Sequence, residues 1–158
     1  MQPEQILYLD FDGVLHPQEV FKDRDGKIYV LGSDGTKSTQ RLFENCPVLE
    51  KVLVPYPELK IVLSTSWVRE LKSFAKAKKR LPTALQSRVI GATFHSHMKV
   101  RLPLGDQSEF ESQLRYQQIL NDVGRRGVKK WLSIDDDDTG LPWELLHKNF
   151  VVPYTERG

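Results

Sequence analysis

A short apolar segment near the N-terminus runs directly into acidic residues: Ile6-Leu7-Tyr8-Leu9-Asp10-Phe11-Asp12-Gly13-Val14-Leu15. A continuous apolar run bounded by turn-forming residues is typical of a strand buried on both faces, as in a parallel sheet. Carboxylates would be costly inside a core, but in α/β proteins ligands bind outside the carboxyl ends of such strands. The stretch therefore predicts an α/β fold with a functional site at the end of its first strand.

Two later apolar segments end in polar residues in the same way. Residues 60–63 are followed by Ser64-Thr65-Ser66, and residues 131–134 are followed by Asp135-Asp136-Asp137-Asp138. The carboxyl ends of parallel strands meet at one edge of a sheet, so we expect these side chains to converge with Asp10 and Asp12 in one crevice.

The remaining segments alternate between strand and helix patterns. Further strands are expected at 88–92 and 150–152, and a hairpin is expected with its turn near Asp25-Gly26. Helices are expected over 47–53, along a face formed by Trp67, Leu71 and Phe74, from Pro82 onward, and from Leu114 to a stop at Gly124. This alternation predicts a parallel sheet with helices on both faces.

Composition fits one globular domain over residues 1–158. The 23 basic and 21 acidic residues give a net charge of +2, which argues against polyanion binding through net charge alone. The single cysteine, Cys46, excludes an intrachain disulfide, and we expect an inert buried thiol with no disulfide-linked partner. No apolar run approaches the roughly 20 residues of a membrane span, and a secretory signal pattern is missing. We therefore expect a cytoplasmic protein without a membrane partner.

Four carboxylates in one crevice would repel each other unless a cation lay among them. Mg²⁺ is the natural choice, because it prefers oxygen ligands and takes one or two carboxylates together with a phosphate. An aspartate beside such an ion can attack phosphorus and form an aspartyl-phosphate. A second acid can protonate the leaving oxygen, and a hydroxyl with a cationic side chain can bind the phosphoryl oxygens.

Three motifs in this order resemble those of the haloacid dehalogenase-like (HAD) superfamily: Asp10-Phe11-Asp12-Gly13-Val14-Leu15, Leu63-Ser64-Thr65 and Leu132-Ser133-Ile134-Asp135-Asp136. The resemblance spans nearly the whole chain and implies a three-layer Rossmannoid fold with a five-stranded, mainly parallel sheet. More narrowly, residues 9–17, 64–67, 88–93 and 134–137 resemble the HAD-type domain of bacterial and phage proteins associated with RNA repair.

The resemblance implies a role for each matching residue. Asp10 would be the nucleophile and a Mg²⁺ ligand, and Asp12 would be the general acid and base, with its backbone carbonyl on the metal. Thr65 would bind the transferring phosphoryl group. Asp136 would ligate Mg²⁺ directly, and Asp135 directly or through water. An acid at position 12 also favours a phosphatase over a dehalogenase, since a phosphatase needs a proton donor for the leaving oxygen.

The family also uses a lysine or arginine that neutralises the nucleophile and the phosphate. Arg115 fits best because it opens the helix before the fourth strand, and Lys99 and Arg101 remain alternatives. The candidate substrate contacts are Gly13, Ser66, Lys99 and His16. For His16, substrate contact and capping of the turn are both open.

Other features keep two interpretations. Trp67 belongs to the core or stacks on a base at the mouth of the site. The basic clusters 76–80 and 125–130 are solvated helix ends or a path for a polyanion. His95-Ser96-His97 is interpreted as a surface loop rather than a metal site, and Trp143 is expected to pack under the last loop.

HAD enzymes commonly select substrates with cap domains, but the insertion slots here are short. Residues 16–45 have room for a small flap hairpin, and residues 93–112 for a short irregular insert, so no large cap is expected. An open site suits phosphates on bulky substrates. The prediction is a Mg²⁺-dependent phosphomonoester hydrolase acting on phosphorylated nucleic-acid ends or nucleotides. Phosphoproteins and small metabolites are alternative substrates, and a non-catalytic HAD-fold or receiver-like Mg²⁺-binding module is the alternative of another class.

Overall fold

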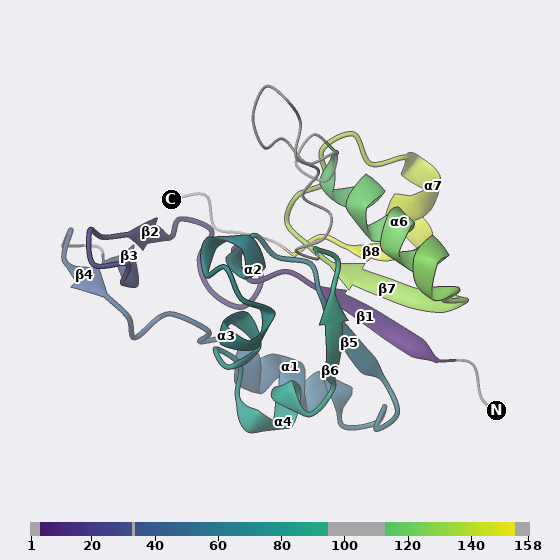
Figure 1. Ribbon diagram of the computed structural model, residues 1–158, viewed down its shortest axis with the longest axis horizontal. Helices are drawn as coiled ribbons and strands as arrows, with labels where there is room; N and C mark the ends of the chain where they lie inside the picture. The colour runs from purple at the N-terminus through teal and green to yellow at the C-terminus, as the bar shows by residue number, and fades with distance from the viewer. Residues whose placement is uncertain (1–3, 33, 95–112, 154–158) are drawn as a thin grey trace.

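The computed structural model describes residues 4–32, 34–94 and 113–153 (Figure 1). Its main sheet has five strands, all parallel, in the order β6-β5-β1-β7-β8. The predicted α/β fold with a five-stranded, mainly parallel sheet is confirmed. The strands are β1 (Gln5–Leu9), β5 (Lys60–Leu63), β6 (Val89–Ala92), β7 (Lys130–Ile134) and β8 (Phe150–Val151).

The central strand β1 ends level with both of its neighbours. Leu9 pairs with Leu63 of β5 and with Ile134 of β7. The alignment continues beyond the strands, because the Ser64 N–H donates to the Leu9 carbonyl over 2.8 Å and the Asp10 N–H donates to the Ile134 carbonyl over 3.2 Å. The polar residues that follow these three strands therefore emerge side by side, as predicted.

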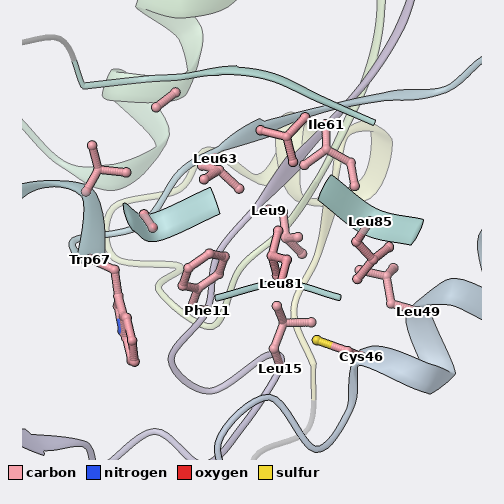
Figure 2. Close-up of a cluster of buried hydrophobic side chains, with 14 of the residues drawn as sticks. Leu9, Phe11, Leu15, Cys46, Leu49, Ile61, Leu63, Trp67, Leu81 and Leu85 are labelled. Atoms are coloured by element: carbon pink, nitrogen blue, oxygen red, sulfur yellow. The ribbon is translucent and has the colours of Figure 1, made fainter. Parts of the chain in front are cut away.

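Helices cover both faces of the sheet. Leu7 and Leu9 point into a core on one face (Figure 2), and Ile6 and Tyr8 point into a second core on the other. This alternation is the two-residue period of a strand buried on both sides. The first core is covered by α1 (Cys46–Leu53), α2 (Trp67–Glu70), α3 (Phe74–Lys78) and α4 (Thr83–Gln86), and the second by α6 (Arg115–Arg126) and α7 (Trp143–Lys148).

Two predicted helix boundaries are wrong. The apolar face of Trp67, Leu71 and Phe74 belongs to two short helices, because the chain turns at Lys72, which has φ 53°. All three side chains still pack on the first core, so they share one face although they do not belong to one helix. The helix α6 continues past Gly124 and ends at Arg126, with Gly127 as its left-handed C-cap.

A second, three-stranded antiparallel sheet follows β1: β2 (Phe21–Lys22), β3 (Ile28–Leu31) and β4 (Lys37–Ser38), called the flap from here on. The hairpin predicted near Asp25-Gly26 joins β2 to β3, and β4 is an additional strand. Ile28 is 6% exposed and belongs to the first core, so the flap is anchored to the body of the protein. Of the second insertion slot, predicted over residues 93–112, only residues 93 and 94 are described; residues 95–112, including His95-Ser96-His97, lie outside the described residues.

Outside the site, one prediction is confirmed and one is wrong. Cys46 is buried, and burial raises the pKa of its thiol to about 12, in keeping with an inert thiol. Trp143 does not pack under the last loop: it is 72% exposed at the start of α7 and contacts the ring of His147. The second core uses Leu141 and Leu145 from this region. Within the described part of the chain, no helix is long and apolar enough to cross a membrane.

Candidate active site

Three aspartates meet at the carboxyl edge of the main sheet. Asp10 follows β1, and Asp135 and Asp136 follow β7, which is the neighbouring strand. One carboxylate oxygen from each lies within 4.8 Å of the other two. Asp10 is 4% exposed and Asp135 is fully buried, so little solvent screens their charges. Strand register alone thus brings together acids that are more than a hundred residues apart in the sequence.

Burial shifts the acid–base equilibria of this cluster. Removal from water raises the pKa of Asp10 well above its ordinary value, the charge of Asp135 raises it further, and Arg115 opposes both. Burial likewise raises the pKa of Asp135 to about 6, against the lowering effect of Arg115. The pKa of Asp136 is raised mainly by burial. The ionised cluster is therefore short of positive charge.

The donor set fits a hard divalent cation. All three groups offer carboxylate oxygens, which Mg²⁺ prefers over nitrogen or sulfur ligands. Asp135 Oδ2 is buried and has no hydrogen-bond partner among the described residues. A buried polar atom without a partner is costly unless a ligand or ion satisfies it. Asp10, Asp135 and Asp136 are accordingly the residues that could hold a metal ion.

Arg115 reaches the cluster from the first residue of α6. Its Nη1 lies 3.4 Å from Asp10 Oδ1 and 3.5 Å from Asp135 Oδ2. It also donates to the Ser64 carbonyl, which fixes the guanidinium against the end of β5. The structure thus places Arg115 where the neutralising cation was expected. Lys99 and Arg101, the alternatives for that role, lie outside the described residues, so the predicted substrate contact of Lys99 stays a prediction.

The carboxylate of Asp12 stands apart from the other three acids, although all four were expected to converge. Among the described residues, the candidate metal group does not include it. Asp12 Oδ1 instead lies 2.7 Å from His16 Nε2 and accepts a hydrogen bond from the Trp67 indole N–H over 2.8 Å. Because the Phe43 N–H donates to His16 Nδ1, the imidazole proton is on Nε2 and is donated to Asp12. Two donors therefore hold Asp12 in one orientation.

His16 and Trp67 are both buried beneath Asp12. His16 is 1% exposed and Trp67 is 2% exposed, and their rings pack against Phe43. Trp67 is thus a core residue, and its ring face is not free to stack on a base. The contacts of His16 and Trp67 with Asp12 were not predicted from the sequence. The only signals for them were a histidine four residues after Asp12 and a tryptophan directly after the second motif.

Gly13 is required by the close approach of Asp136. Its φ of +77° is rarely adopted by other residues, and a Cβ at this position would collide with the Asp136 carboxylate. A side chain here would therefore disturb one of the three clustered acids. The lack of a side chain at Gly13 leaves room for the Asp136 carboxylate. The predicted contact of Gly13 with substrate stays a prediction.

Two pockets open beside the acids, and Ser66 lines both. The flap pocket has a volume of about 190 Å³ and is lined by Asp12, Val20, Phe21, Lys22, Ile28, Ser66, Trp67 and Glu70. The polar pocket has a volume of about 250 Å³ and is lined by Thr65, Ser66, Arg69, Thr93, Gln113, Leu114, Arg115, Gln118, Asp137 and Thr139.

Thr65 and Arg115 face the polar pocket from two elements. Thr65 is 6% exposed, and its Oγ1 accepts the Trp67 N–H over 3.2 Å at the start of α2. Its hydroxyl proton remains available for an acceptor in the pocket. A hydroxyl beside a guanidinium suits the oxygens of a phosphoryl group. The structure thus brings together Asp10, Thr65, Arg115, Asp135 and Asp136, whereas Asp12 lines the flap pocket.

Comparison with known proteins agrees with this arrangement. A family model described as the HAD domain in Swiss Army Knife RNA repair proteins matches residues 6–158. The match includes all three strand ends and the first residue of α6. No curated protein and no solved structure matches the chain.

Proposed function

The chain belongs to the family of HAD domains in Swiss Army Knife RNA repair proteins, and from this membership and the site geometry we propose that it is a Mg²⁺-dependent phosphomonoester hydrolase. The family suggests a phosphatase-type hydrolase, and the three clustered aspartates could hold a divalent metal. The observation that carries the proposal is the division of the four acids. Three share one buried cluster with Arg115, and Asp12 is held separately.

In this proposal, Asp10 is the nucleophile. A carboxylate oxygen of Asp10 forms a bond to phosphorus, and the bond from phosphorus to the leaving oxygen breaks. Thr65 and Arg115 bind the phosphoryl oxygens, where negative charge must be stabilised. A bound Mg²⁺ would neutralise charge between the phosphate and Asp10, Asp135 and Asp136. The product of this step is an aspartyl-phosphate on Asp10.

Asp12 moves the protons in both steps. Its protonated form gives a proton to the leaving oxygen, and the resulting carboxylate then takes a proton from the water that attacks the aspartyl-phosphate. The second step releases inorganic phosphate and restores the Asp10 carboxylate. His16 and Trp67 act as positioning residues, because their N–H groups hold Asp12 Oδ1 and leave Oδ2 for the proton.

The test is hydrolysis of p-nitrophenyl phosphate by the purified protein with Mg²⁺. We expect phosphate release that EDTA abolishes. Asp10→Asn should lower the rate by about 10⁴-fold or more, since loss of a nucleophile removes the whole covalent route. The matched control is Asp138→Asn, an exposed acid in the loop after β7, which should keep the wild-type rate. Activity that survived Asp10→Asn would contradict the nucleophile assignment.

Nucleic-acid ends are the proposed substrate class, because the matching family is that of RNA repair proteins. A competition panel would decide the question, with 3′- and 5′-phosphorylated oligonucleotides, free nucleotides, a phosphopeptide and a sugar phosphate. We expect the highest kcat/KM for oligonucleotides, with a rate that falls as salt rises. Equal rates across the panel would remove this substrate class and leave the hydrolase proposal in place.

A further inference from the structure

The flap pocket adjoins the proton donor of the proposed reaction, on which this inference rests. Asp12 lines the flap pocket, whereas Thr65 and Arg115 line the polar pocket. If the phosphoryl group binds to Thr65 and Arg115, the leaving oxygen must lie within reach of Asp12. The group attached to that oxygen then extends toward the flap pocket. The polar pocket would thus hold the phosphoryl group, and the flap pocket would hold the leaving group.

The lining of the flap pocket combines an aromatic wall, formed by the exposed ring of Phe21, with polar groups. Ile28 and Trp67 line the pocket but are only 6% and 2% exposed, and Lys22 and Glu70 supply charged groups of opposite sign. Its volume of about 190 Å³ is smaller than the roughly 300–1,000 Å³ of pockets that enclose a whole drug-sized ligand. It can therefore hold one ring system of a larger substrate. A flat ring with polar edges, such as a nucleobase, matches this lining.

Phe21 is the residue best placed to contact such a ring. It is 39% exposed on β2, which is high for a phenylalanine, and it lines the pocket. The Tyr29 ring stacks on it from β3, with centroids 5.7 Å apart and planes 24° apart, and the Lys37 ammonium lies 4.7 Å from the Tyr29 ring centre. The Phe21 ring is thus supported from within the flap. Rings held in this way act as stacking platforms for bases.

A basic segment continues along the chain from Trp67, which lines the same pocket. The segment 67–80, which contains α2 and α3, has six basic residues and one acidic residue. Arg80 lies over the ring of Trp67, 5.6 Å from its centre, and Trp67 lines the pocket. Lys72, Lys76 and Lys79 are exposed along this segment. In Figure 1, α2 and α3 lie on the side of the main sheet nearer to the flap.

The other basic cluster does not share this position. Arg125 and Arg126 both pair with Asp122, and Lys130 begins β7 at the edge of the sheet opposite the acids. Of these two basic clusters, only the one in segment 67–80 therefore adjoins the flap pocket. A run of cations next to an aromatic wall favours a nucleic-acid strand over a phosphoprotein as the polymer that binds here.

We propose that the flap pocket binds the terminal nucleoside of a phosphorylated nucleic-acid strand, with its base against Phe21, and that the exposed lysines of segment 67–80 contact the neighbouring phosphates. In this arrangement the terminal phosphate lies at Asp10, and the sugar oxygen that leaves lies at Asp12. The aromatic wall recognises the presence of a base, and the lysines recognise the charge of the strand.

The experiment compares oligonucleotides that differ only in the terminal residue, which is either normal or abasic, each with a 3′- or a 5′-phosphate. We expect the wild-type protein to hydrolyse the base-bearing substrate with about 10-fold higher kcat/KM, in line with the contribution of one stacked base. Phe21→Ala should bring this ratio close to one, and Phe21→Trp should preserve it. The control is Trp143→Ala, which removes an exposed aromatic ring outside the site and should leave the ratio unchanged.

The lysines are tested by paired double variants of equal charge change. Lys76→Ala with Lys79→Ala should reduce the salt dependence of kcat/KM for oligonucleotides. Lys129→Ala with Lys130→Ala, at the opposite edge of the sheet, should not. Equal salt dependence of the two double variants would overturn the path along segment 67–80.

Binding measurements separate this inference from the proposed function. Fluorescence anisotropy with the Asp10→Asn variant reports base preference without any catalysis. If the wild-type protein hydrolyses neither oligonucleotides nor p-nitrophenyl phosphate, but the base preference in binding depends on Phe21, the proposed function fails and the docking site stands. If p-nitrophenyl phosphate is hydrolysed but normal and abasic ends react and bind equally, the docking site is overturned. Preference for a phosphopeptide over both oligonucleotides would also overturn it.

Discussion

The two ends of α6 carry two ionic clusters, each built around a buried aspartate, with opposite charge balance. At its first residue, Arg115 faces the site cluster of Asp10, Asp135 and Asp136. Near its last turn lies the second cluster, in which Asp122 is 2% exposed and contacts Tyr8, Arg125 and Arg126. Both clusters join α6 to β1, but only the site cluster has more acids than cations.

Charge balance distinguishes a structural ionic cluster from one that needs a ligand. Asp122 accepts the Tyr8 hydroxyl over 2.7 Å and the Arg126 Nε–H over 2.7 Å, and it also pairs with Arg125. Burial and the Asp122 charge raise the pKa of Tyr8, so its hydroxyl stays protonated and remains a donor. The site cluster has one arginine for three acids, and one of its buried carboxylate oxygens has no hydrogen-bond partner among the described residues. This contrast indicates that the second cluster is complete, whereas the site cluster is not.

The largest expected difference is in stability without metal. Asp122→Asn should lower the free energy of unfolding by about 3 kcal/mol, because two arginines lose their buried partner. The same chemical change at the site, Asp10→Asn, should leave stability unchanged or raise it, since it removes one of three crowded negative charges. Urea unfolding of both variants in EDTA measures the difference. An equal decrease in the free energy of unfolding in both variants would show that Asp10 and Asp122 are equally well compensated by their partners.

Addition of Mg²⁺ should stabilise the protein through the site cluster alone. At a concentration 100 times its Kd, a ligand that binds only the folded state raises the free energy of unfolding by about 2.7 kcal/mol. We expect this gain in the wild type and in Asp122→Asn, and its loss in Asp135→Asn. Thermal unfolding with and without MgCl₂ provides the measurement. A full gain in Asp135→Asn would contradict the assignment of this acid to the metal.

The metal-free protein should also lose stability as pH rises. The pKa of Asp135 is about 6 in the folded protein against an ordinary value of 3.8, so the folded state holds a proton that the unfolded state releases. Its contribution is complete only below the ordinary pKa of 3.8 and is lost as pH rises through 6. Between pH 4 and pH 8 the loss should be about 2 kcal/mol.

The control for this pH effect is Asp135→Asn, in which the residue cannot titrate. The free energy of unfolding is measured from pH 4 to pH 8 in EDTA for both proteins. The difference between them removes the contribution of every group that does not interact with Asp135. A difference that stayed constant over this range would show that Asp135 has an ordinary pKa.

The smallest expected effect is that of Tyr8→Phe in the second cluster. Loss of the hydroxyl removes one of three partners of Asp122 and should lower the free energy of unfolding by about 1 kcal/mol. Phosphatase activity should not change, because Tyr8 points to the face of the sheet opposite Leu9 and away from the site. A large loss of activity would show that the two clusters are coupled through β1.

Strand ends were the most informative part of the sequence. Apolar runs that stop at Asp10, Ser64 and Asp135 were enough to predict a parallel sheet and a shared edge, and both are confirmed. The predictions of the sheet and its shared edge succeed because backbone pairing in a parallel sheet aligns strand ends regardless of their separation in the chain. The preference for Arg115 over Lys99 and Arg101 stays a prediction, since Lys99 and Arg101 lie outside the described residues.

Side-chain direction could not be predicted in the same way. The separate orientation of Asp12 depends on His16 and Trp67, and Trp67 begins α2, where its ring packs against Phe11, two residues beyond β1. The exposure of Trp143 depends on where α7 begins. The flap pocket forms between two segments that are about 40 residues apart in the sequence.

The sequence by itself determined the fold class, the edge of the sheet that carries the site, and the identity of its acids, because hydrophobic pattern and strand pairing are local or periodic properties. Only the tertiary structure decided how those acids divide into a metal-type cluster and a separate Asp12. It also decided which basic segment lies beside the pocket. The physical reason is that burial, charge balance and hydrogen-bond partners depend on packing between distant segments, which a local pattern does not encode.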